Sequence, residues 1–224
     1  VKAVEPTTRD TLLSLERLKV ELRFWKLLKK EVEIEEISIR NATFDTRDFI
    51  DGVVVSGHLG ELFLESHGVV FSPETARINE FSVKNTDVSL TLGSIESTDT
   101  VPSEPLYWKI LLDEIDFENV GFALKMPQDS LFVRTMLPKT TLKNGVIDLK
   151  EASYYVKSFG IDNAELAYGP KEELFLQQIG LQLDSIYYCG KDIRANIEEF
   201  VLKERSGLEL VSTGGRIVSD SVLI

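Results

Sequence analysis

One pattern of apolar and polar positions recurs along the chain. It reads apolar, two polar, apolar, any, apolar, any, Asn, any two, apolar, any, apolar. Four strong copies begin near residues 34, 78, 112 and 156, and their asparagines are Asn41, Asn85, Asn119 and Asn163. Accidental matches of the apolar positions alone are expected in a chain this apolar, so the shared asparagine is what establishes the repeat.

Weaker copies lie between or beyond the strong ones when residues other than asparagine are allowed at the asparagine position. They begin near residues 15, 59, 137, 176 and 197, and the copy at 137 carries Asn144. The steps from 34 to 59 to 78 are 25 and 19 residues, and the same steps recur from 112 to 137 to 156. We therefore predict one continuous β-repeat domain over residues 1–224.

The spacing within each copy is that of a β-strand. Apolar positions two apart put their side chains on one face, while intervening residues such as Ser38, Asp116 and Glu118 are polar. The two-residue steps shift the phase by one residue, as a bulge or bend would, and Asn tolerates the positive φ of such a bend. We predict an all-β fold, an elongated, curved and mostly antiparallel sheet that forms a trough. The pattern leaves open whether each Asn bends a long strand or lies near a tight hairpin.

Two segments depart from the repeat. Residues 94–105 are rich in Ser, Thr and Pro and predict an internal loop, after which the repeat resumes around Trp108. Residues 11–30 fit either one amphipathic helix or, as we favour, a strand at 18–24 followed by a short helix at 25–30. A helix that lies on a membrane surface is the functional alternative for this stretch.

Composition narrows the classes of function. The 224 residues are 43% hydrophobic and 28% charged, which excludes a wholly disordered chain. With 25 basic and 37 acidic residues the net charge is −12, which opposes binding to nucleic acid and to anionic headgroups. The sequence has no apolar window long enough to span a membrane as a helix, and it starts at Val1 without a signal-peptide pattern. We interpret it as a piece of a longer protein.

The sequence carries no motif for catalysis. A phosphate-binding loop, a nucleophile elbow and a zinc-protease motif are all lacking. We interpret His58 and His67 as exposed turn residues, Cys189 as a small packing residue, and Gly214–Gly215 as a hairpin turn. Adjacent acidic residues such as Glu35 and Glu36 fit a solvated face of the sheet. We therefore expect no enzymatic activity, no metal site and no cofactor.

The opening block resembles the AsmA/TamB superfamily. The block runs from Leu15 to Asn41, LERLKVELRFWKLLKKEVEIEEISIRN, and is followed by further I-x-x-I-x-I-x-N copies. The resemblance covers nearly the whole chain and is densest at 15–46 and 78–168. It implies a periplasmic, β-groove lipid-transfer protein anchored to the inner membrane through a missing N-terminal segment. It also implies a role in outer-membrane biogenesis, by phospholipid transport or β-barrel assembly. The sequence does not distinguish the AsmA-like branch of the superfamily from the TamB-like branch.

The hypothesis is therefore a non-enzymatic conduit that shields acyl chains in an apolar groove. The residues predicted to line it are Ile37, Ile39, Phe81, Val83, Ile115, Phe117, Phe159 and Ile161. The expected partner is a phospholipid or another acyl-chain ligand, with outer-membrane assembly proteins reached through missing regions and no nucleic acid. The alternative is a structural β-repeat domain with a closed core that binds protein partners. A carbohydrate-binding solenoid would need more aromatic residues than Trp25 and Trp108 supply.

Overall fold

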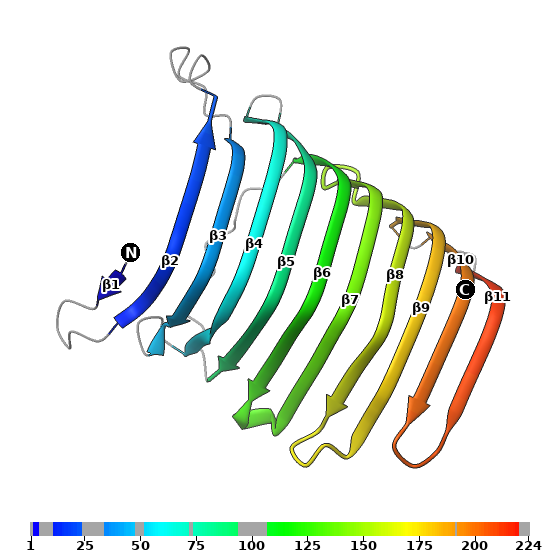
Figure 1. Ribbon diagram of the computed structural model, residues 1–224. Helices are drawn as coiled ribbons and strands as arrows, with labels where there is room; N and C mark the ends of the chain where they lie inside the picture. Colours follow the sequence, from blue (N-terminus) through cyan, green and yellow to red (C-terminus); the bar gives the residue numbers. More distant parts are fainter. Residues whose placement is uncertain are drawn as a thin grey trace.

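The computed structural model is a single open sheet of 11 strands (Figure 1). It describes residues 2–4, 11–23, 34–47, 52–71, 74–93, 107–190 and 192–219. Within these ranges there is no α-helix, and a 3₁₀ turn, η2 (Pro127–Asp129), lies between two of the strands. The predicted all-β, elongated and curved sheet is confirmed.

The strands follow one another in the sheet in the order of the sequence. They are β1 (Lys2–Val4), β2 (Thr11–Leu22), β3 (Ile34–Asp45), β4 (Val53–Phe71), β5 (Glu74–Leu92), β6 (Lys109–Met126), β7 (Leu131–Asp148), β8 (Ser153–Tyr168), β9 (Leu174–Cys189), β10 (Asp192–Glu204) and β11 (Glu209–Ser219). Every neighbouring pair is antiparallel except β5 and β6, which run parallel. The sheet is therefore mostly antiparallel, as predicted.

The structure decides between the two predictions for the N-terminal stretch that starts at Thr11. Residues Thr11–Leu22 form β2, so the interpretation of this stretch as a single helix is wrong there, and the strand is confirmed as far as Leu22. The short helix predicted at 25–30 and the loop predicted at 94–105 lie outside the described residues.

The repeat asparagines bend long strands, which settles the choice that the pattern left open. Asn41, Asn85, Asn119 and Asn163 have φ values of 48°, 50°, 53° and 55°, and each lies inside a strand rather than at a hairpin. The register places these asparagines side by side on one line across β3, β5, β6 and β8. An αL residue turns the chain and interrupts the alternation of side chains, so the apolar positions before and after it stay on one face.

β4 and β7 run antiparallel to the strands that carry the repeat asparagines. Opposite those asparagines they have residues that tolerate an interrupted hydrogen-bond ladder. Gly60 of β4 lies opposite Asn41 and Asn85, and a Cβ there would come within 2.6 Å of the Asn85 carbonyl oxygen. Pro138 of β7 lies opposite Asn119 and Asn163. Proline has no N–H to donate, so it is tolerated where the ladder is already interrupted.

A second line of bends lies nearer the other strand ends. Gly68, Asn144 and Ser185 have positive φ there, in β4, β7 and β9. The weaker copies of the repeat put the bend of β4 at Ser66 and that of β9 at Leu183, which is two residues early in both strands. Both copies lack an asparagine at this position, so the apolar spacing alone placed the bend, whereas the residues that adopt positive φ are Gly68 and Ser185. Figure 1 shows the long strands curving in step.

The sheet is a single layer without a closed core. None of the large side chains in the described residues is fully buried. The chain exposes 14939 Å², whereas a compact protein of this mass exposes roughly 10300 Å². A single open layer leaves more of its surface in contact with water than a compact fold does.

Two turn assignments are wrong, for the same reason. His58 and His67 are exposed as expected but lie inside β4, and Gly214–Gly215 lies inside β11. Polar residues and glycines predict turns in short strands, whereas these strands are as long as 19 residues and pass through such positions at their bends and edges.

Candidate functional site: a continuous apolar face

The residues predicted to line a groove lie in two neighbouring rows between the two lines of bends. Each row crosses the strands from β3 to β9, with one residue per strand directly opposite the next. The first row is Ile37, Leu64, Phe81, Ile115, Leu142, Phe159 and Leu183. The second row is Ile39, Leu62, Val83, Phe117, Thr140, Ile161 and Leu181. We call the face that these rows define the apolar face.

The apolar face continues beyond the predicted residues. Val20 and Leu18 of β2 pair with the start of the two rows, and Ile197 and Phe200 of β10 pair with their end. At β11 the rows stop, because Gly215 and Ser212 occupy the paired positions. The predicted residues therefore lie in the middle of a surface that spans nine strands, from β2 to β10.

Side chains of the apolar face pack against those of the neighbouring strands, and no second layer of the described structure covers them. The rings of Phe81 and Phe117 meet edge to face with centroids 6.2 Å apart, as favoured for neighbouring aromatic rings. Leu18 and Val20 of β2, which pair only with β3, are 49% and 48% exposed. Val83 of β5 is 8% exposed, because strands on both sides shield the side chains in the middle of the face.

Small residues are buried beside the first line of bends. Ala42, Thr86 and Ala164 each follow a repeat asparagine and point to the same side as the next apolar position. They are only 4%, 2% and 2% exposed in a sheet one layer thick, while the repeat asparagines are exposed. Ala167, which points to the opposite side of β8, is 1% exposed, so small residues are buried on both faces near the bends.

The opposite face carries charges that alternate in sign from strand to strand. One row between the bends reads Arg40, Glu61, Lys84, Glu118, Lys139 and Asp162. Lys84 Nζ lies 3.1 Å from Glu118 Oε2, and Gln182 Nε2 donates to Asp162 Oδ1 at 2.8 Å. Opposite charges directly across a strand pair stabilise the sheet and keep this face in water. We call it the charged face.

A second row on the charged face is acidic. Glu36, Glu65, Glu80 and Glu114 lie directly opposite one another in four successive strands. Lys19 contacts Glu36 at 2.9 Å, and Lys143 contacts Glu114 at 2.7 Å. In the part of the chain that the structure describes, no group of three or more His, Cys, Asp or Glu side chains has the geometry to hold a metal ion.

The ion pairs of this face hold its lysines in the charged form. Hydrogen bonding to Glu118 raises the pKa of Lys84, and hydrogen bonding to Glu114 raises the pKa of Lys143. The Glu21 and Glu36 carboxylates together raise the pKa of Lys19. These lysines are exposed, so the pairs organise the surface without contributing much to the free energy of folding.

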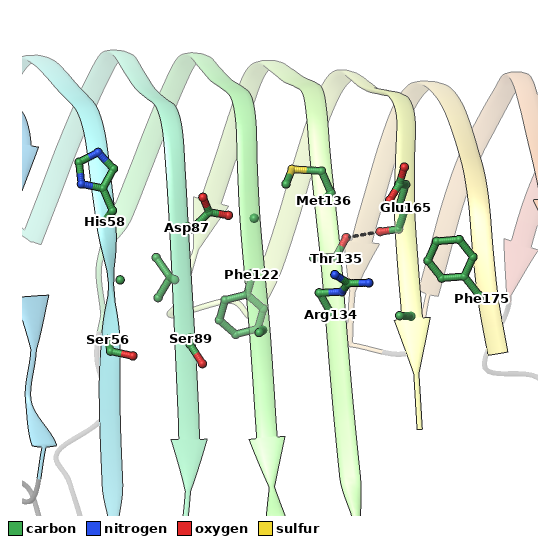
Figure 2. A pocket seen from close by; sticks show the side chains of 15 residues that line it. Ser56, His58, Asp87, Ser89, Phe122, Arg134, Thr135, Met136, Glu165 and Phe175 are labelled. Carbon is green, nitrogen blue, oxygen red and sulfur yellow. Dashed lines mark hydrogen bonds between the residues drawn. The ribbon is translucent and has the colours of Figure 1, made fainter. Parts of the chain in front are cut away.

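A depression of about 350 Å³ lies below the first line of bends (Figure 2). Its lining comes from β4 to β9 and includes Ser56, His58, Asp87, Arg134, Met136, Glu165 and Phe175. Small residues make room for it, since a Cβ on Gly121 would collide with the Asp87 carboxylate. The Arg134 guanidinium is already paired with Glu172 at 2.8 Å. The sequence patterns did not predict this depression. The signal that could have indicated it is the presence of the small residues Gly121, Ala123 and Ala167 within long strands.

Comparison with known proteins adds no assignment, since no family model and no curated protein matches the chain. The described residues include no helix long and apolar enough to cross a membrane. The sheet itself, one long mixed layer of repeating strands, is consistent with a β-groove repeat fold.

Proposed function

We propose that this chain is part of a non-enzymatic β-groove protein that shields lipid acyl chains on its apolar face. The observation that carries the proposal is the apolar face itself, which runs without a charged residue along its two central rows from β3 to β9. An uncovered surface of this size marks a binding site rather than a core.

The driving force is hydrophobic transfer. Each methylene group that leaves water for an apolar surface contributes about 0.8 kcal/mol, so one acyl chain of ordinary length supplies enough free energy to bind. Because the rows continue from strand to strand with little change in character, an acyl chain finds similar contacts at each step. Such a surface conducts lipids passively, with no reaction and no cofactor.

The resemblance of residues 15–41 and of the later repeats to the AsmA/TamB superfamily supports a more specific setting. In that setting the protein lies in the periplasm, is anchored to the inner membrane, and serves outer-membrane biogenesis by moving phospholipid or assisting β-barrel assembly. The open single layer supports this function over a closed-core domain, because a closed core would hide large side chains completely.

Photocrosslinking from paired positions tests the proposal. A photoreactive amino acid replaces Phe117 or Phe159 on the apolar face, and Asp116 or Ser158, one residue earlier in the same strand, serves as the matched control on the charged face. We expect lipid crosslinks from Phe117 and Phe159 only, with phospholipid extracted from the purified protein by organic solvent.

Two results would contradict the proposal. One is the absence of both co-purified lipid and crosslinks at the apolar positions. The other is crosslinking of a protein instead of a lipid at these positions, which would identify a structural domain whose apolar face is covered by a partner chain.

A further inference from the structure

Aromatic residues gather at one end of the sheet. Five of the six tyrosines lie there, at the ends of β6, β8 and β9 beyond the second line of bends, together with Trp108. The tyrosines are Tyr107, Tyr154, Tyr155, Tyr187 and Tyr188. The register joins these ends, because Ser153 pairs with Cys189 and the Leu149 N–H donates to the Trp108 carbonyl oxygen at 3.0 Å. We call these six residues the aromatic end.

The tyrosines occupy both faces of the layer. Tyr154 pairs with Tyr188 on the apolar face, with ring centroids 5.5 Å apart. Tyr155 pairs with Tyr187, and both point to the opposite face because neighbouring residues in a strand alternate. Tyr154, Tyr155 and Tyr187 are 38%, 38% and 37% exposed. Rings on both sides of a single layer share no common core, so packing within the sheet does not explain their gathering.

The charge of the chain is distributed unevenly between the two ends of β8 and β9. Residues 148–157 and 184–194 contain four acidic and four basic residues and are neutral. Residues 162–178, at the opposite end of the same strands, contain four acidic residues and one lysine, a net charge of −3. An anionic surface therefore repels the aromatic end less than it repels the opposite end of the same strands.

We propose that the aromatic end docks into the headgroup layer of a phospholipid membrane, where acyl chains pass onto the apolar face. Tyrosine suits this position because its ring is apolar and its hydroxyl is polar, and such rings collect where a membrane meets water. Tyr154 and Tyr188 stand at the margin of the apolar face, so the docked end and the proposed acyl-chain surface are continuous. The docking step, in which the aromatic end enters the headgroup layer, does not depend on the proposed function. The transfer step, in which acyl chains pass onto the apolar face, rests on the proposed function.

Vesicle flotation tests the docking step. The vesicles contain phosphatidylcholine and phosphatidylglycerol in a ratio of about four to one, so that they carry the negative charge of a bacterial membrane. The test variant is Tyr155→Ser with Tyr187→Ser, which removes two rings from the charged side and leaves the apolar face intact. Tyr168→Ser, which removes a 50% exposed ring at the opposite end of β8, is the matched control.

We expect the double variant to bind vesicles about tenfold more weakly than the unaltered chain, because two rings no longer leave water. Tyr168→Ser should bind as the unaltered chain does. In a Trp25→Phe background, brominated phospholipids should quench the fluorescence of Trp108, which reports contact of the aromatic end with acyl chains. Circular dichroism checks that each variant keeps the sheet.

A fluorescent fatty acid separates this inference from the proposed function. The double variant should still bind the fatty acid, since the rows of the apolar face are unchanged. Failure of the unaltered chain to float with vesicles, an equal loss on Tyr168→Ser, or unquenched Trp108 would overturn the docking step while leaving the acyl-chain surface untouched. Failure to bind the fatty acid with flotation intact would overturn the proposed function and the transfer step instead.

Discussion

At the scale of the residue, asparagine bends a strand at five positions of the described sheet, four of them on the first line of bends. Asn41, Asn85, Asn119 and Asn163 each adopt the left-handed conformation that bends the strand, and their side chains bridge to neighbours on the exposed side. Asn119 Nδ2 donates to Asn85 Oδ1 at 3.3 Å, and Gln178 Nε2 donates to Asn163 Oδ1 at 2.9 Å. Asn is favoured because its short polar side chain tolerates positive φ, which a β-branched residue does not.

Substitution at Asn119 measures this preference. Asn119→Val should lower the free energy of unfolding by about 1–2 kcal/mol, because φ at this position is 53° and the left-handed region excludes β-branched residues. Asn119→Gly should cost less, since glycine adopts this conformation freely. Chemical denaturation of the three proteins provides the comparison. Equal losses for Val and Gly would mean that the hydrogen bond to Asn85, rather than the backbone, decides the residue.

At the scale of the element, each strand is held to the next by opposite charges on one face and apolar contacts on the other. Lys84 is the central example, because Glu61 and Glu118 lie directly opposite it in β4 and β6. The Lys84–Glu118 pair joins β5 to β6, the parallel neighbours in the described sheet, and parallel ladders are slightly less stable than antiparallel ones.

Charge reversal tests the contribution of that row. Lys84→Glu places three carboxylates side by side and should lower the thermal midpoint, with the loss shrinking as salt increases. Lys84→Met, which removes the cation without adding a third carboxylate, should lower the midpoint less. A loss that is independent of salt and equal for the two variants would show that packing of the Lys84 side chain matters instead.

The same pair predicts a dependence on alkaline pH. The folded-state pKa of Lys84 lies above the ordinary 10.5, so its stabilising effect is fully present below 10.5 and is lost as the pH rises through the folded-state value. The difference in thermal midpoint between the unaltered chain and Lys84→Met should therefore shrink between pH 9 and about pH 12. A difference that stays constant over this range would contradict the assignment.

Sequence patterns predicted elements and faces better than they predicted register. The rows that contain Ile37 and Ile39 were recognised because alternation assigns a face to each residue independently of its neighbours. The bends at Gly68 and Ser185 were misplaced because these two copies carry no asparagine at the expected position, and apolar spacing alone does not locate a residue of positive φ. The aromatic end was not recognised because Tyr107, Tyr154 and Tyr187 are far apart in sequence and only strand pairing brings them to the same end of the sheet. The depression near Gly121 was not recognised because its lining comes from six strands, β4 to β9.

At the scale of the whole molecule, the sheet behaves as a one-dimensional array. Strands pair only with their immediate neighbours in sequence order, and the described edges carry little burial: every residue of β11 is exposed. Stability in such arrays comes from neighbour contacts, so it should be greatest in the middle and decline toward the edges.

Hydrogen exchange measures this gradient. Peptides from β11 (Glu209–Ser219) should lose protection well before peptides from β7 (Leu131–Asp148), which has a long partner on each side. Mass spectrometry of exchange at increasing denaturant separates the two. Simultaneous loss of protection in both strands would indicate a single cooperative unit and contradict the array.

The alternating row of charges has a consequence for the origin of the sheet. The repeat starts at 34, 59 and 78 return at 112, 137 and 156, a shift of 78 residues each, so β6 to β8 correspond to β3 to β5. A unit of three strands ends pointing the way it began, and a tandem duplicate must therefore join it in parallel, as β6 joins β5.

An unchanged duplicate would also have set a cation beside Lys84. Instead, the three charges of the first unit, Arg40, Glu61 and Lys84, are inverted in the second, Glu118, Lys139 and Asp162. With the signs exchanged, the anion Glu118 rather than a second cation lies opposite Lys84. The alternation ends where neutral Gln182 bonds to Asp162, so β9 to β11 do not continue it as a third copy.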